Sequence, residues 1–170
     1  CKPEQLILID GSAEAVRKIN HSDYLGIVAT NQSVVARGLC SEKDIAQIHK
    51  TLDRMLGEKQ AFLDAIYYCP HHPDRGFEGE NTDYKIRCAC RKPEPGMILQ
   101  ARDDFNINLG KSFIIGDSTR DMMAGYNAGL KTILVRTGYA GKDGRYDCRP
   151  DFVFENLREA VDFIVDEYKG

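Results

Sequence analysis

Short apolar runs alternate along the chain with segments whose apolar positions recur every three or four residues. Apolar runs bounded by polar or glycine-containing turns are typical of buried strands, and the wider spacing indicates helices with one apolar face. The strands expected on this basis span residues 25–29, 65–68, 112–115, 131–135 and 151–154. Strands that alternate with helices predict an α/β fold, with a Rossmann-like parallel sheet flanked by helices.

Local signals mark the ends of two helices. Ser41 and Asp44 have the spacing of a capping box, in which the first residues of a helix bond to each other. Gly129 follows the periodic segment 119–128, at the position where a left-handed residue often closes a helix. We therefore expect one helix to open at Ser41 and another to close at Gly129. Further helices are expected around residues 13–19, after Pro95 and from Asn156.

Four potential metal ligands form two tight pairs, Cys69 with His71 and Cys88 with Cys90. Three thiolates and one imidazole, grouped two and two across a loop, match the ligand set of a tetrahedral structural zinc ion. A disulfide framework and plain core thiols are the alternatives. A domain of this length does not need disulfides, and Cys88 and Cys90 are too close for an unstrained bridge. We predict a zinc-binding loop insertion.

Polar residues follow three of the predicted strands at their carboxyl ends. They are Thr30–Ser33, Arg91 with Lys92 behind the zinc ligands, and Gly116–Ser118. The carboxyl ends of parallel strands meet at one edge of a sheet. Each residue alone has a structural explanation, such as a helix cap or a solvated charge. Together a hydroxyl, amides, two cations and a carboxylate predict a phosphate site with a divalent cation.

Composition narrows the possible partners. The 170 residues, 42% of them hydrophobic, fit one globular domain over 1–170. A formal net charge of −3 gives no basic field for nucleic acid, and no apolar run approaches the length of a membrane span. We expect a cytoplasmic monomer that acts on a small molecule. Cys40 and Cys148 are expected to be packing or surface thiols, with a lipid-bearing Cys1 as a minor alternative.

Three short motifs resemble those of the haloacid dehalogenase phosphatase superfamily. Thr30 within Ile-Val-Ala-Thr-Asn-Gln-Ser resembles the second motif, Lys92 the third, and Gly116-Asp117 with Asp121 the fourth. The longer segments 30–38, 67–73 and 88–96 are similar to signatures of one subfamily, the D-glycero-D-manno-heptose 1,7-bisphosphate 7-phosphatases, zinc ligands included. The resemblance covers nearly the whole chain.

The resemblance implies a Mg²⁺-dependent phosphatase of the lipopolysaccharide heptose pathway, with Zn²⁺ as a structural ion. It implies phosphoryl transfer to an aspartate followed by hydrolysis. Asp117 would hold magnesium, while Lys92 and Thr30 would contact the phosphoryl oxygens. The residues implied around the sugar bisphosphate are Asn31, Gln32, Ser33, Arg37, Arg91 and Lys92. Histidinol-phosphate phosphatase and a non-catalytic phosphosugar-binding module are the alternatives.

One motif of the superfamily is missing. No Asp-x-Asp-x-Thr sequence, which would supply the nucleophile and the general acid/base, occurs in the chain. We therefore expect that the domain is incomplete at its N-terminus, that the sheet lacks a central strand between 25–29 and 112–115, and that this chain alone is inactive. The rival interpretation makes Leu6–Ile9 that strand and Asp10 the nucleophile, but Ser12 stands where the second aspartate belongs.

Overall fold

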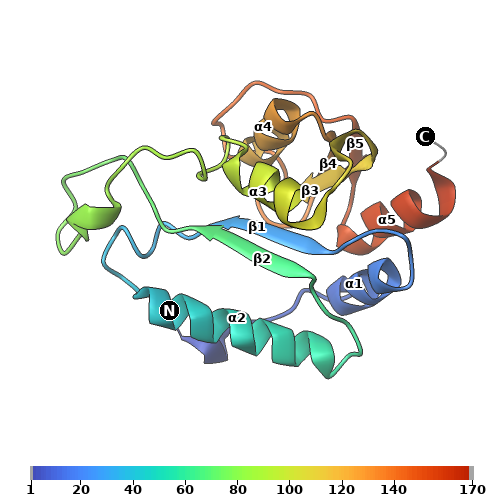
Figure 1. Ribbon diagram of the computed structural model, residues 1–170, viewed down its shortest axis with the longest axis horizontal. Helices are drawn as coiled ribbons and strands as arrows, with labels where there is room; N and C mark the ends of the chain where they lie inside the picture. Colours follow the sequence, from blue (N-terminus) through green and yellow to red (C-terminus); the bar gives the residue numbers. More distant parts are fainter. Residues whose placement is uncertain (1, 169–170) are drawn as a thin grey trace.

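The computed structural model describes residues 2–168, which fold into parallel strands flanked by helices, as predicted (Figure 1). Cys1, and with it the lipid-bearing alternative, lies outside the described residues. The helices are α1 (Ser12–Asn20), α2 (Glu42–Gly57), α3 (Gly96–Phe105), α4 (Thr119–Ala128) and α5 (Leu157–Asp162). The strands are β1 (Ile27–Asn31), β2 (Ala65–Cys69), β3 (Phe113–Gly116), β4 (Lys131–Val135) and β5 (Phe152–Phe154). Short 3-10 turns span Pro3–Gln5, Thr82–Tyr84 and Leu109–Lys111, and a π-turn spans Phe163–Glu167.

Within the described residues the strands form two parallel sheets. β1 pairs with β2, and the second sheet has the order β3-β4-β5. No backbone ladder joins β1 to β3, so the predicted gap in the sheet is present in this part of the chain. Residues 6–9 form no strand, and Ile7 is 82% exposed. Asp10 is exposed as well, and the strand that the rival interpretation places at residues 6–9 is absent, so that part of it is wrong.

The helix-capping residues predicted from the sequence cap the helices in the structure. The N–H of Ser41 donates to Asp44 Oδ2 at 2.8 Å and the N–H of Asp44 donates to Ser41 Oγ at 3.2 Å, which completes the capping box of α2. Gly129 closes α4 with a left-handed φ of 75°. β1 instead begins two residues later than expected, because the N–H of Gly26 donates to the Asp64 carboxylate at 2.7 Å and not to a neighbouring strand.

The core consists of separate apolar clusters beside the sheets. One joins α1 to α2, and a second packs β4 against α5 and the π-turn. A third, made of Val35, Cys40 and Ile45, packs the turn after β1 against the start of α2. Cys40 is disulfide-bonded, so the expectation of a thiol there is wrong, whereas Cys148 is a free thiol. Among residues 2–168, every helix is too short or too polar to cross a membrane.

Candidate active site and metal centre

Cys69, His71, Cys88 and Cys90 bring their ligand atoms together at the end of β2. All four ligand atoms lie within 4.8 Å of one another. The sulfur of Cys90 lies 3.1 Å from that of Cys69, 3.2 Å from that of Cys88 and 3.4 Å from His71 Nδ1. A tetrahedral zinc ion with Zn–S bonds of about 2.3 Å separates its sulfurs by roughly 3.8 Å. The predicted cluster is therefore assembled, and its donor set fits a tetrahedral thiophilic ion.

Burial makes the thiolate form of this cluster costly unless a cation compensates it. Burial raises the pKa of the Cys69 and Cys90 thiols, because it disfavours the thiolate form. A metal ion between the sulfurs reverses this effect by stabilising the thiolates. The next residue, Arg91, donates from Nη1 to the His71 carbonyl at 3.0 Å. The cluster thus also fixes the side chain of Arg91.

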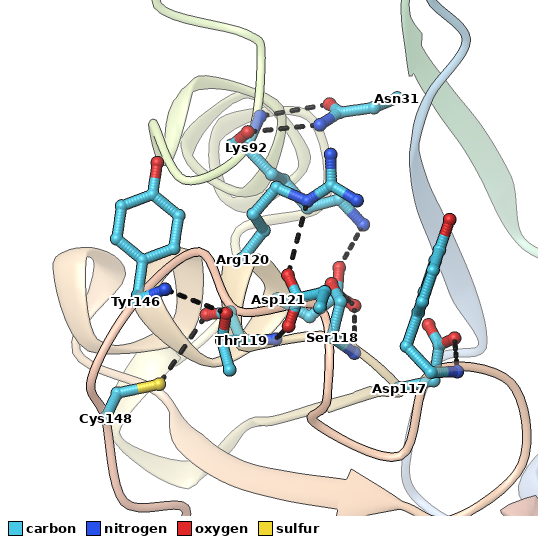
Figure 2. Close-up of polar contacts among 11 residues, drawn as sticks. Asn31, Lys92, Asp117, Ser118, Thr119, Arg120, Asp121, Tyr146 and Cys148 are labelled. Carbon is cyan, nitrogen blue, oxygen red and sulfur yellow. Dashed lines mark hydrogen bonds and ion pairs between the residues drawn. The ribbon is translucent and has the colours of Figure 1, made fainter.

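Lys92 lies between the end of β1 and the start of α4 (Figure 2). Its Nζ donates to the Ala29 carbonyl at 2.6 Å and forms an ion pair with Asp121 Oδ1 at 2.6 Å. Asn31 holds the Lys92 backbone, because its Oδ1 accepts the Lys92 N–H at 3.0 Å and its Nδ2 donates to the Lys92 carbonyl at 3.1 Å. These contacts fix the ammonium at the carboxyl end of β1.

Asp117 follows β3 and faces a tight turn. Its Oδ2 accepts the backbone N–H of Tyr139 at 2.8 Å. Gly138 adopts a φ of +70°, and a Cβ there would lie 2.1 Å from Asp117 Oδ2, so the close approach requires glycine. The N-cap of α4 is Ser118, not Asp117, since Asp121 Oδ2 accepts the Ser118 N–H at 3.1 Å and its hydroxyl at 2.6 Å.

The turn after β1 carries the remaining predicted residues. Thr30 Oγ1 lies 3.4 Å from Gln32 Nε2, at the end of the strand. The carbonyl of Ser33 accepts the N–H of Arg37 at 3.1 Å, which folds the turn back on itself. The Arg37 guanidinium lies 6.0 Å from the ring centroid of Phe77, in the loop before α3. The turn thus places Arg37 between the end of β1 and this loop.

In the structure Lys92 contacts both Asn31 and Asp121. Asp117 lies beside this group (Figure 2). Sequence reasoning missed Arg120, which stands in the first turn of α4. An arginine is unfavourable next to the positive end of a helix dipole, and this anomaly was a signal that the sequence contained. Asp143, which faces Arg120, lies in a loop where no local pattern pointed to it.

Comparison with known proteins gives concordant matches. A family model described as "HAD-hyrolase-like" matches residues 89–160. The chain is 45% identical over 163 residues to a Pasteurella multocida (strain Pm70) protein named D-glycero-beta-D-manno-heptose-1,7-bisphosphate 7-phosphatase, covering 95% of this chain and 85% of the relative. A Yersinia pestis protein of the same name is 36% identical, with coverage of 95% and 84%.

Solved structures agree with the sequence matches. The crystal structure of a D,D-heptose 1,7-bisphosphate phosphatase from B. bronchiseptica, complexed with magnesium and phosphate, superposes with a TM-score of 0.81 at 34% identity. The match covers 95% of this chain and 85% of that one. A D,D-heptose 1,7-bisphosphate phosphatase from Burkholderia thailandensis superposes with a TM-score of 0.68 at 25% identity, covering 94% and 86%.

Proposed function

Because this chain belongs to the family of D-glycero-beta-D-manno-heptose-1,7-bisphosphate 7-phosphatases, within the HAD-like hydrolases, we propose that it removes the 7-phosphate of that heptose bisphosphate. The observation that supports the proposal most is the arrangement around Lys92. Its side chain is 14% exposed, and its ammonium is held at the carboxyl end of β1 by Ala29 and Asp121, with Asp117 at the end of β3 beside it. Fixed cations at strand ends bind and neutralise phosphoryl groups.

The proposal gives each residue of the site a separate task. Lys92 and the Thr30 hydroxyl contact the oxygens of the transferred phosphate, and they need no reorganisation because their positions are set by the fold. Asp117 is the carboxylate that would hold magnesium, which when bound supplies positive charge against the phosphate. Asn31 holds Lys92 in place through both backbone hydrogen bonds.

The sugar side of the proposed site is cationic. Arg91 presents a guanidinium, which suits a second phosphate or sugar hydroxyls better than an ammonium does. Gln32, Ser33 and Arg37 border the same strand end and would contact the sugar. Since a guanidinium does not lose its proton near neutral pH, these contacts would persist across the physiological range.

We propose zinc for the cluster of Cys69, His71, Cys88 and Cys90. Three sulfurs and one imidazole nitrogen fit zinc, and four protein ligands leave no position for a reactive water. The ion would therefore be structural, and it would order the loop that carries Arg91. Elemental analysis of the purified protein tests this, with about one zinc per chain as the expected result.

Turnover of two phosphate esters by the protein expressed from its complete gene tests the substrate. We expect release of phosphate from heptose 1,7-bisphosphate that depends on magnesium, and at least tenfold lower kcat/KM for histidinol phosphate. Preference for histidinol phosphate would overturn the proposed substrate. Binding of the bisphosphate without any turnover would leave only the non-catalytic phosphosugar-binding alternative.

We propose a cytoplasmic monomer. Thiolate metal ligands are most stable in a reducing compartment, which supports the location. Fractionation of the host cell tests it, and recovery from an oxidising compartment, where the disulfide of Cys40 would persist, would overturn it. Light scattering on the purified protein tests the monomer.

A further inference from the structure

Asp143 is a buried carboxylate that the proposed mechanism does not use. Its side chain is 4% exposed. Oδ1 accepts the N–H of Thr119 at 2.8 Å, at the start of α4. Oδ2 is buried without a hydrogen bond among the described residues, and it faces Nε of Arg120 at 3.7 Å. A buried charge is costly unless another charge compensates it, so Asp143 holds the guanidinium of Arg120 close.

Asp143 is charged in this environment. Burial alone would raise its pKa, but hydrogen bonds from Thr119 and the charge of Arg120 hold the pKa below its usual value. The carboxylate therefore contacts Arg120 as an anion at neutral pH. A neutral partner would leave Arg120 free to turn toward solvent.

Arg120 directs its unused donors into the site. The ion pair with Asp143 engages Nε, and no hydrogen bond engages either Nη group among residues 2–168. Figure 2 shows the guanidinium turned toward Lys92 and Asn31. An arginine fork with two free Nη groups matches the oxygens of a phosphate.

A second cation makes an anion at this position more favourable. Arg91 is half-buried, its Nη1 donates to the His71 carbonyl at 3.0 Å, and the charge of Arg120 acts on it. Guanidinium groups that are close together repel one another, and an anion between them removes the repulsion. Lys92 is already paired with Asp121, whereas the Nη groups of Arg120 are available for a further anion.

We propose that Arg120 binds the second phosphate of the sugar bisphosphate, the one that is not transferred, and that Asp143 is the positioning residue that aims it. Figure 2 places Asp117 on the far side of the Lys92–Asp121 ion pair from the Arg120 guanidinium. The transferred phosphate belongs beside Asp117 and Lys92, so Arg120 reaches the other end of the substrate. This inference rests on the proposed function and adds a determinant of specificity to it.

Calorimetric titration with two probes tests the inference. Heptose 1-phosphate carries only the second phosphate and is not turned over, and inorganic phosphate occupies the transferred-phosphate position. In the presence of magnesium, Arg120→Ala is expected to weaken binding of heptose 1-phosphate roughly 10- to 100-fold. Binding of inorganic phosphate is expected to change by less than about threefold, and Arg120→Lys should restore part of the lost affinity.

Two further variants distinguish loss of the orientation of Arg120 by Asp143 from a general loss of folded structure. Asp143→Asn keeps an acceptor for Thr119 but removes the charge, so it should weaken heptose 1-phosphate binding in the same direction as Arg120→Ala. Arg136→Ala is the matched control, because the Arg136 side chain is 61% exposed and, among the described residues, forms an ion pair with Glu155 alone on the surface. The control should bind both probes like the unmodified protein.

The binding results distinguish a failure of the proposed role of Arg120 from a failure of the proposed phosphatase function. Unmodified protein that binds neither probe would overturn the proposed function, and the inference with it. Unmodified protein that binds heptose 1-phosphate, together with an Arg120→Ala variant that binds it equally well or loses both probes equally, would overturn the inference alone. Circular dichroism checks that each variant is folded. If Arg120→Ala does not fold, the affinities of Arg120→Lys for the two probes are compared with those of the unmodified protein instead.

Discussion

Replacing Asp121 should destabilise the protein more than the loss of a helix cap can explain. The Asp121 side chain is 10% exposed, and its two oxygens have different partners. Oδ1 forms the ion pair with Lys92 at 2.6 Å, and Oδ2 accepts two hydrogen bonds from Ser118. Removing one member of a buried ion pair costs about 3–5 kcal/mol, and losing a cap costs about 1 kcal/mol. Asp121→Ala should therefore lower the free energy of unfolding by about 4–6 kcal/mol.

The chain offers a matched control for this prediction. Asp44 forms the same kind of capping box with Ser41 at the start of α2, but no ion pair within residues 2–168 involves it. Urea denaturation followed by circular dichroism measures both losses. The loss in Asp121→Ala should exceed the loss in Asp44→Ala by about 3 kcal/mol or more, since only the first variant leaves a buried ammonium without its carboxylate.

A double-mutant cycle identifies the partner. The variants Asp121→Asn, Lys92→Met and the double substitution should show a coupling energy of about 3 kcal/mol, with the double variant more stable than the sum of the single losses predicts. Equal losses in Asp121→Ala and Asp44→Ala, or a coupling energy below about 0.5 kcal/mol, would refute the reasoning. The contact with Lys92 would then be no more than a surface ion pair.

Three further predictions concern the metals and pH. Cys88→Ser, or treatment with a zinc chelator, should increase amide hydrogen exchange over residues 69–92 while α2 stays protected; unchanged exchange would argue against a structural ion. Asp117→Asn should abolish the response of turnover to magnesium, and a preserved response would remove Asp117 from the metal site. Hydrogen bonds from Thr132 lower the pKa of Asp151, so its stabilising contribution is complete above the unfolded pKa of about 4 and is lost as pH falls through the folded value. The decrease in melting temperature between pH 7 and pH 3 should therefore be smaller in Asp151→Asn than in the unmodified protein.

The sequence predicted those elements whose ends carry their own signals. The bounds of α4 and β4 agree with the expected ranges, because Ser118, Gly129 and an apolar run define them locally. β1 was displaced because the hydrogen bond from Gly26 to Asp64 joins residues far apart in the chain. Long-range contacts of this kind leave no periodic pattern.

In the candidate site too, residues with a local sequence signal were predicted, and those paired by long-range contacts were not. The four metal ligands were found because the spacing within each pair is typical of metal ligands, and the structure brings the two pairs together. The pairing of Lys92 with Asp121, and of Arg120 with Asp143, depends on how α4 packs against loops that are distant in the sequence. A charge inside a folded site and a charge on the surface look alike in a sequence, so these partners required the structure.

Lys92 connects two sheets that share no backbone hydrogen bonds in the described chain. Its backbone is fixed to Asn31 and its ammonium to Ala29 on the β1-β2 sheet, while Asp121 belongs to the helix that follows β3. The neighbouring Pro93 carbonyl accepts a hydrogen bond from Asn127, also on α4. Any sliding of one sheet against the other would therefore shift the ammonium, and a phosphate bound to that ammonium would resist the sliding. Mutations far from the site that loosen the contact between the sheets should for this reason act as mutations of phosphate affinity.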